Sequence, residues 1–283
     1  MKKISFFAAA LLVAAGFLPL QAQDDAKVPG MLSGPGIGKL GTVAQVEVPT
    51  GFIFLDAKLT KAMVKKMGET PTGRELGYIH PANGDWSVFF EFDDIGYVKD
   101  DDKDKLDAAK LLDSYKRGAV EENKQRKASG EPPLEIIGWL QEPKYDTETH
   151  NLTWAIRASS GGHEFLNYNT RLLGRKGVME LVLVCEPENL TKTMPQFKQV
   201  LANHKFTTGQ SYAEYKPGDK IAKVGLAALV IGGAAVGAAK LGLFAWLAVL
   251  LKKGFKLIIV AVVAVAAFFK KFFGRLFGRK SDD

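Results

Sequence analysis

One group of polar residues has the composition needed for acid–base chemistry. The segment WLQEPKYDTETH carries Glu142, Tyr145, Asp146 and His150 around a single expected turn. The segment NYNTRLLGR adds Asn167, Asn169 and Arg171 on a neighbouring strand pattern. An acid–base pair could be assembled from these types, but polar residues also alternate along a half-solvated antiparallel sheet. We therefore treat four of them as weak catalytic candidates: Glu142, Tyr145, His150 and Arg171.

An acidic run, GYVKDDDKDKLDAAKLL, is a second place where chemistry could occur. Asp100, Asp102 and Asp104 fall on the first, third and fifth positions of a calcium loop. Lys105 stands where that loop requires glycine, and Leu111 where it requires a bidentate glutamate. Carboxylates also suit the start of a helix, because its free amides and dipole attract negative charge. We expect this run to begin a helix rather than to bind a metal.

Other site motifs fail on their sequence context. A dinucleotide-like glycine spacing is followed by a strand pattern instead of a helix, at Gly36, Gly38 and Gly41. The histidines have no zinc-like spacing: His80, His150, His163 and His204. Cys185 is the only cysteine, and its apolar surroundings indicate a buried structural thiol. We expect no cofactor and no metal, and the sequence leans away from an enzyme.

Charge divides the chain into two regions. The 283 residues have a formal net charge of +7, yet residues 24–219 contain 25 Lys and Arg against 29 Asp and Glu. Residues 220–283 contain 11 against 2. The main region is therefore mildly acidic and has no electrostatic footprint for nucleic acid.

The elements that must position these side chains are short strands and a few helices. Strands are predicted over 43–48, 52–55, 86–92, 134–141, 152–158, 164–173 and 178–185. Helices are predicted over 57–67, 103–128 and 191–204. The segments YDTETHNL and LGRKGV indicate hairpin turns. Consecutive strands with tight turns predict an α+β domain over 42–219, with an antiparallel sheet and packed helices, while the Gly- and Pro-rich residues 23–41 predict a linker.

Both ends of the chain are apolar. Residues 1–22 have the layout of a cleavable signal peptide. Residues 220–273 predict a membrane anchor of one or more passes, with a single long helix over 224–251. The basic tail, 274–283, is expected on the cytoplasmic side, and a hairpin that places it outside is the alternative. Gly233 and Gly237 form a G-x-x-x-G that predicts a homo-oligomer.

Several separate motifs resemble one bacterial family. They are GDWSVFFEFDDIGYVKDDDKDKLDAAKLL, IIGWLQEPKYDTETHNLTWAI, LNYNTRLLGRKGVMELVLV and DKIAKVGLAALVIGGAAVGAAKLGLF, which look like domain-of-unknown-function family 2167, described as predicted membrane-anchored proteins. The resemblance runs from about Gly41 through the anchor. It implies an exported domain at the bacterial envelope and no established activity. The segments GFIFLD and PQFKQVLANHKFTTG, with a long helix between them, are similar to PsbP-like α/β/α sandwiches, which concerns fold alone.

These features predict a bacterial inner-membrane protein whose main domain is exported to the periplasm. We expect a non-enzymatic binding or scaffold module for an envelope protein or cell-wall ligand, with membrane lipid as a further partner and no role for nucleic acid. The alternative is a membrane-tethered periplasmic enzyme, a hydrolase that uses the cluster of Glu142, Tyr145 and His150.

Overall fold

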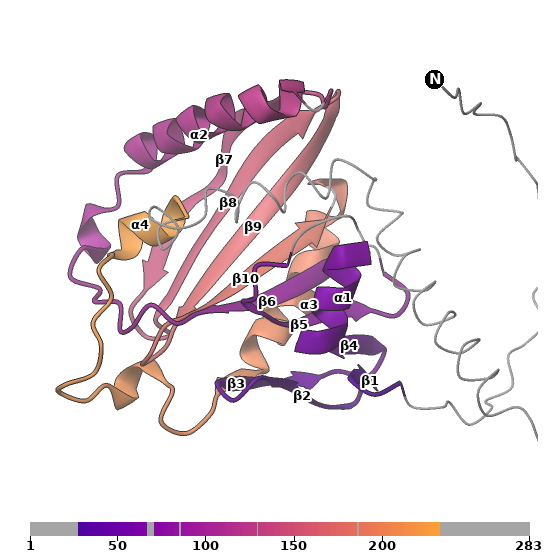
Figure 1. Cartoon of the computed structure of the whole chain (residues 1–283), viewed down its shortest axis with the longest axis vertical. Coiled ribbons are helices and arrows are strands. Elements are labelled where there is room, and N and C mark those ends of the chain that lie inside the picture. The colour runs from indigo at the N-terminus through magenta and orange to yellow at the C-terminus, as the bar shows by residue number, and fades with distance from the viewer. Residues whose placement is uncertain (1–27, 67–70, 85, 129, 186, 233–283) are drawn as a thin grey trace, which may run out of the picture.

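The computed structural model describes residues 28–66, 71–84, 86–128, 130–185 and 187–232 (Figure 1). The predicted signal peptide, the Gly233 and Gly237 pair, the anchor beyond residue 232 and the basic tail lie outside these described residues.

An eight-stranded antiparallel sheet forms the centre of the molecule. Its strands, in spatial order, are β1 (Met31–Ser33), β4 (Phe52–Asp56), β5 (Glu75–Pro81), β6 (Ser87–Asp93), β10 (Val178–Cys185), β9 (His163–Leu173), β8 (Asn151–Ser160) and β7 (Leu134–Asp146). A smaller sheet has the order β11 (His204–Phe206), β3 (Ala44–Val48) and β2 (Gly36–Leu40). Every pair of neighbouring strands is antiparallel. The predicted α+β fold with an antiparallel sheet is confirmed.

Helices cover this sheet at separate places. The α-helices are α1 (Ala57–Lys66), α2 (Ala108–Ala128), α3 (Leu190–Ala202) and α4 (Leu226–Val230). Short 3-10 helices are η1 (Lys103–Lys105), η2 (Pro187–Asn189) and η3 (Tyr212–Glu214). In Figure 1, α2 and α4 lie at one end of the sheet, and α1 lies toward the other end.

Strand β10 shows how the sheet separates two cores. Its alternate residues Met179, Leu181 and Leu183 belong to the core that contains Phe197 of α3. Val178 belongs to the core that contains Tyr115 of α2. A third, smaller core joins α1 to strands β4, β5 and β6. One face therefore packs under α3 and the small sheet, and the other under α2 and α4 at one end and α1 at the other.

The predicted linker over 23–41 is wrong for its second half, because it contains β1 and β2. Close packing explains why no strand pattern was recognised in this segment. A Cβ on Gly38 would lie 2.8 Å from the ring of Phe54, so only glycine lets β2 approach the main sheet this closely. Strand β5 was also missed, because most of its residues are buried and no polar alternation marks it.

The long middle helix begins at Ala108 rather than Lys103. Residues Lys103–Lys105 form η1, which has no side-chain cap. Asp107 begins α2 instead, because its Oδ1 accepts a hydrogen bond from the Lys110 amide at 3.0 Å. The predicted helix over 191–204 is shorter, since α3 ends at Ala202 and His204 opens β11.

The start of the predicted anchor belongs to the folded domain. Helix α4 buries Leu226, Leu229 and Val230 in the core under α2. It ends at Val230, and Gly232 has a φ of +88°, so the single helix predicted over 224–251 is interrupted there. Among the described residues, no helix is both long and apolar enough to cross a membrane.

Candidate functional site

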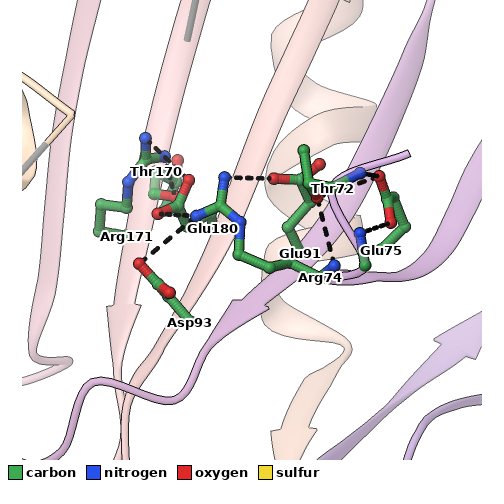
Figure 2. A network of polar contacts seen from close by, with 9 residues as sticks. Thr72, Arg74, Glu75, Glu91, Asp93, Thr170, Arg171 and Glu180 are labelled. Carbon is green, nitrogen blue, oxygen red and sulfur yellow. Dashed lines mark hydrogen bonds and ion pairs between the residues drawn. The ribbon is translucent and has the colours of Figure 1, made fainter. Parts of the chain in front are cut away.

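A network of charged side chains links the loop before β5 to strands β6, β10 and β9 (Figure 2). Arg74 Nη2 lies 3.2 Å from Glu91 Oε2, and its Nη1 lies 3.4 Å from Asp93 Oδ2 and 3.5 Å from Glu180 Oε1. Glu180 Oε2 lies 3.2 Å from Arg171 Nη2. Strand register explains this grouping, because Glu180 is the cross-strand neighbour of both Glu91 and Arg171.

Charges in this network hold one another in place. Burial raises the pKa of Asp93, against the opposing effect of Arg74. Burial alone would lower the pKa of Arg74, but the carboxylates of Glu180, Glu91 and Asp93 outweigh it and raise that pKa. Two arginines face three carboxylates here, so removing either arginine would leave a buried negative charge without its counterion.

The loop before β5 presents Arg74 to this network. Glu75 Oε1 accepts hydrogen bonds from the Thr72 amide at 2.6 Å and the Thr72 hydroxyl at 3.0 Å. Its Oε2 accepts one from the Gly73 amide at 2.9 Å. Figure 2 shows these bonds fixing the turn beside the arginine. Glu75 thus has a structural role and leaves Arg74 to the other carboxylates.

Arg171, the predicted catalytic arginine, is part of this buried network. Its side chain is 2% exposed, and its guanidinium lies 4.8 Å from the ring centroid of Trp154. Trp154 Nε1 donates to Tyr115 Oη at 2.9 Å, and Tyr115 Oη donates to the carbonyl of Val230 at 2.6 Å. A continuous series of contacts therefore runs from the charged network to the last residue of α4.

Tyr145 and His150 are brought together, as predicted. Tyr145 Oη lies 3.1 Å from Asp100 Oδ2 and 3.1 Å from His150 Nδ1. A phenol has one proton, so when Tyr145 donates to Asp100, Nδ1 of His150 must donate to the phenol oxygen. Burial, with the added effect of Asp100, raises the pKa of Tyr145, which keeps the phenol protonated at neutral pH. Tyr145 is thereby a hydrogen-bond donor rather than a base.

The imidazole of His150 packs into a stack of aromatic rings. Its centroid lies 4.3 Å from that of Tyr212, and Tyr97 lies 4.4 Å from both Tyr212 and Tyr215. Tyr212 Oη donates to the carbonyl of Val98 at 2.9 Å, and burial raises the pKa of this phenol. His150 has a φ of +54°, an uncommon value for a residue other than glycine. The turn is held in this conformation with the ring against Tyr212.

Tyr212 and Tyr215 belong to a segment that leads out of the domain, residues 209–232, which we call the strap. Its backbone pairs with Tyr97, whose amide donates to Lys220 O at 2.8 Å, while Tyr97 O accepts from the Ala222 amide at 2.8 Å. In Figure 1 the strap is the orange segment that ends in α4. Two of the four catalytic candidates, Tyr145 and His150, thus lie at the attachment of the strap.

Asp102 also fastens the strap. Its carboxylate accepts hydrogen bonds from the amides of Leu226 at 3.2 Å and Ala227 at 3.4 Å, so it caps α4. A Cβ on Gly225 would lie 2.6 Å from the same carboxylate, which explains the glycine at this position. Within the acidic run, Asp107 therefore serves the start of α2, and Asp102 serves the start of a helix 124 residues away in the chain.

The strap's own carboxylates point inward. Arg175 donates from Nε and Nη2 to the two oxygens of Asp219, at 2.7 and 2.8 Å. Glu214 accepts from the Ser211 hydroxyl at 2.7 Å and from the Gly209 amide at 2.9 and 2.8 Å. The Ser211 hydroxyl and these amides lower the pKa of Glu214 to about 2, and Arg175 lowers that of Asp219 to about 2.

The remaining sequence candidates are dispersed. Glu142 is exposed on β7, whereas Tyr145 is half-buried. Asn169 Nδ2 donates to Asn167 Oδ1 at 2.7 Å. Cys185 is buried, in agreement with the structural thiol predicted from its surroundings. Within the part of the chain that the structure describes, no three His, Cys, Asp or Glu side chains are grouped to hold a metal.

Sequence reasoning missed Arg74 and the strap. Arg74 lies in a Gly-containing loop with no motif around it. Residues 220–232 of the strap contain apolar residues that continue into residues 233–269, and this continuity led to their assignment to the anchor. The capping pair Asp102 and Gly225 carries no local signal, because its partners are far apart in sequence.

Comparison with known proteins identifies a family. No curated protein matches the chain. The solution structure of cyanobacterial PsbP (CyanoP) from Synechocystis sp. PCC 6803 is similar at 15% sequence identity, over 67% of this chain and 99% of that chain, with a TM-score of 0.38. A likeness of that size carries no argument about function. The model of the family described as "Protein of unknown function (DUF2167)" matches residues 33–266, and the chain belongs to that family.

Proposed function

We propose that this protein is an exported, membrane-anchored envelope protein whose folded domain is a non-enzymatic binding or scaffold module. The observation that carries the proposal is the use made of the candidate catalytic side chains. Tyr145 and His150 hold the aromatic stack on the strap, and Arg171 lies in the buried network beneath α4. These groups support a rigid attachment between the domain and the segment that follows it.

The sequence on either side of the domain supports the location. The strap continues directly into the apolar residues 233–269, and residues 1–22 have the pattern of a signal peptide. We place the anchor in the inner membrane and the domain in the periplasm. A module held this firmly would present its exposed surface to an envelope protein or to the cell wall in one orientation.

One observation favours the alternative, a membrane-tethered periplasmic hydrolase. The contacts between Asp100, Tyr145 and His150 could leave Nε2 of His150 as a proton acceptor, which is the arrangement of a general base. In our proposal the same contacts position the ring against Tyr212.

Labelling tests the location. In the full chain with Cys185→Ser, a cysteine introduced by Ala62→Cys on α1 should react with an impermeant maleimide in intact spheroplasts. The protein should also stay in the membrane pellet after alkaline carbonate extraction. Labelling only after lysis would contradict export of the domain, and extraction into the supernatant would contradict the anchor.

A second experiment separates a binder from an enzyme. Detergent-purified full-length protein is immobilised and exposed to solubilised envelope fractions and to cell-wall sacculi. We expect saturable retention of one component, unchanged in chemical structure. Conversion of that component to a product, lost in His150→Asn, would establish the hydrolase instead.

A further inference from the structure

The outward surface of the strap combines apolar side chains with lysines. Among the described residues, seven large hydrophobic side chains are exposed, and three of these lie in the strap: Tyr215, Ile221 and Ile231. The lysines of the strap are exposed as well: Lys216, Lys220 and Lys223. We call these six residues the lysine surface.

Local contacts join three of these six residues. Tyr215 stacks on Tyr97 at 4.4 Å, and Tyr97 forms a β-bridge with Ile221. Lys220 is also tied to this region, because its Nζ donates to the carbonyl of Asp94 at 2.8 Å. An aromatic residue, an aliphatic residue and a lysine are therefore presented together, which is the composition found where proteins meet lipid headgroups.

The acidic residues of the strap are already occupied by hydrogen-bond donors. Asp219 is engaged by Arg175, and Glu214 by the amides of Gly209 and Ser211. The negative charge of the strap is thus compensated from within, and the lysines remain to act outward. This arrangement complements an anionic surface.

The position of the exit adds a geometric constraint. Ile231 is exposed, and Gly232 follows it as the last residue of the strap. The sequence then continues at once with Gly233, Ala234, Ala235 and Val236. Since one residue spans at most about 3.6 Å, no spacer separates the strap from the apolar segment. A domain joined to a bilayer in this way must have its exit side close to the headgroups.

We propose that the lysine surface rests on anionic lipid headgroups and fixes the orientation of the domain on the membrane. This inference depends on the proposed anchor. A protein bound at the same surface is the competing occupant, and the experiment below separates the two.

The test uses the full chain reconstituted in vesicles, with Cys185→Ser as the background. A fluorophore is attached through Tyr215→Cys, through Ile221→Cys or, as a control on α1, through Ala62→Cys. Quenching by a lipid that carries a nitroxide on its headgroup is measured in phosphatidylcholine vesicles with and without phosphatidylglycerol. Flotation on a density gradient reports whether the protein is in the vesicles at all.

We expect several-fold stronger quenching at positions 215 and 221 than at 62, and a further increase with phosphatidylglycerol. The combined variant Lys216→Gln, Lys220→Gln and Lys223→Gln should remove the dependence on phosphatidylglycerol. The matched variant Lys58→Gln, Lys61→Gln and Lys65→Gln should keep it. Equal quenching at all three positions in protein that floats would overturn the lysine surface as a lipid contact and leave a protein partner as its occupant. Failure to float would instead contradict the anchor of the proposed function.

Discussion

Two polar clusters lie along one row of cross-strand neighbours, which runs from Tyr145 through Leu152, Arg171 and Glu180 to Glu91, and they hold different parts of the molecule in place. The charged network around Arg74 and Arg171 joins strands within the domain through buried ion pairs. The cluster around Tyr145, His150 and Tyr212 joins the domain to the strap through single hydrogen bonds and ring contacts. Buried charges make loss of one partner costly, whereas a half-exposed contact can open locally. The comparison indicates that the network specifies the fold and the aromatic cluster specifies the attachment.

The largest effect is expected in the charged network. Arg171→Leu should lower the free energy of unfolding by about 3–5 kcal/mol, because Glu180, Glu91 and Asp93 would then share Arg74 alone. The matched control is Arg157→Leu, whose side chain is 43% exposed and pairs with Glu164. It should cost at most about 1 kcal/mol.

Denaturant unfolding of the full chain in detergent, followed by tryptophan fluorescence, measures both variants. Similar losses for the two arginines would show that burial gives Arg171 no special role.

A smaller and local effect is expected at the cap of α4. Asp102→Ala removes both hydrogen bonds to the amides of Leu226 and Ala227, a loss of about 1 kcal/mol by the usual value of a cap. Hydrogen exchange at residues 226–230 should accelerate. Asp104→Ala, an exposed change in η1, is the control and should leave that exchange unaltered. Acceleration across the whole sheet would contradict a local role for Asp102.

Lowering the pH should destabilise the protein in two successive steps, first through His204 and then through Glu214 and Asp219. Burial lowers the pKa of His204 to about 4, so the unfolded chain binds more protons than the folded one between about pH 6.5 and pH 4. Stability should therefore fall as pH drops through that window. Glu214 and Asp219 have pKa values lowered to about 2, so their contribution is present above pH 4.5 and is lost between about pH 4.5 and pH 2.

Measuring melting temperature against pH checks this order. His204→Phe should flatten the upper window only, and Asp219→Asn with Glu214→Gln the lower one only. If either change removed the whole pH dependence, His204 and the two carboxylates of the strap would titrate as one unit.

The smallest expected effect concerns self-association, which we propose through Gly233 and Gly237. Gly233→Ile should reduce crosslinked dimers in membranes by preventing close approach of two backbones. Gly232→Ala is not a suitable control, because Gly232 has a positive φ. Ala234→Ile is one. Unchanged dimer yield in Gly233→Ile would exclude this contact.

The sheet was predictable from sequence where turns are short and strands alternate. The turn at residues 146–151 and the turn at 174–177 were found because their signals are local. Strands β1, β2 and β5 escaped, since their signals depend on packing partners such as Phe54 against Gly38. The sequence placed Tyr145 and His150 around one turn, and the structure adds the direct contact between them.

The role of that pair could not be predicted. Tyr212 contacts His150 and Asp102 caps α4, and both contacts join segments that are distant in the chain. Arg171 was singled out as a polar strand residue, but its burial beside Trp154 follows from packing by α2 and α4. Long-range contacts of this kind leave no local signal in the sequence.

The central claim is that His150 positions the strap. Hydrogen exchange of residues 209–232 in the full chain, compared between the wild type and His150→Asn, tests it most directly. Asparagine tolerates the positive φ at this position, so the change removes the ring contact without straining the turn. The account predicts faster exchange in 209–232 with unchanged exchange in β6, β9 and β10. Unchanged exchange in the strap would contradict it.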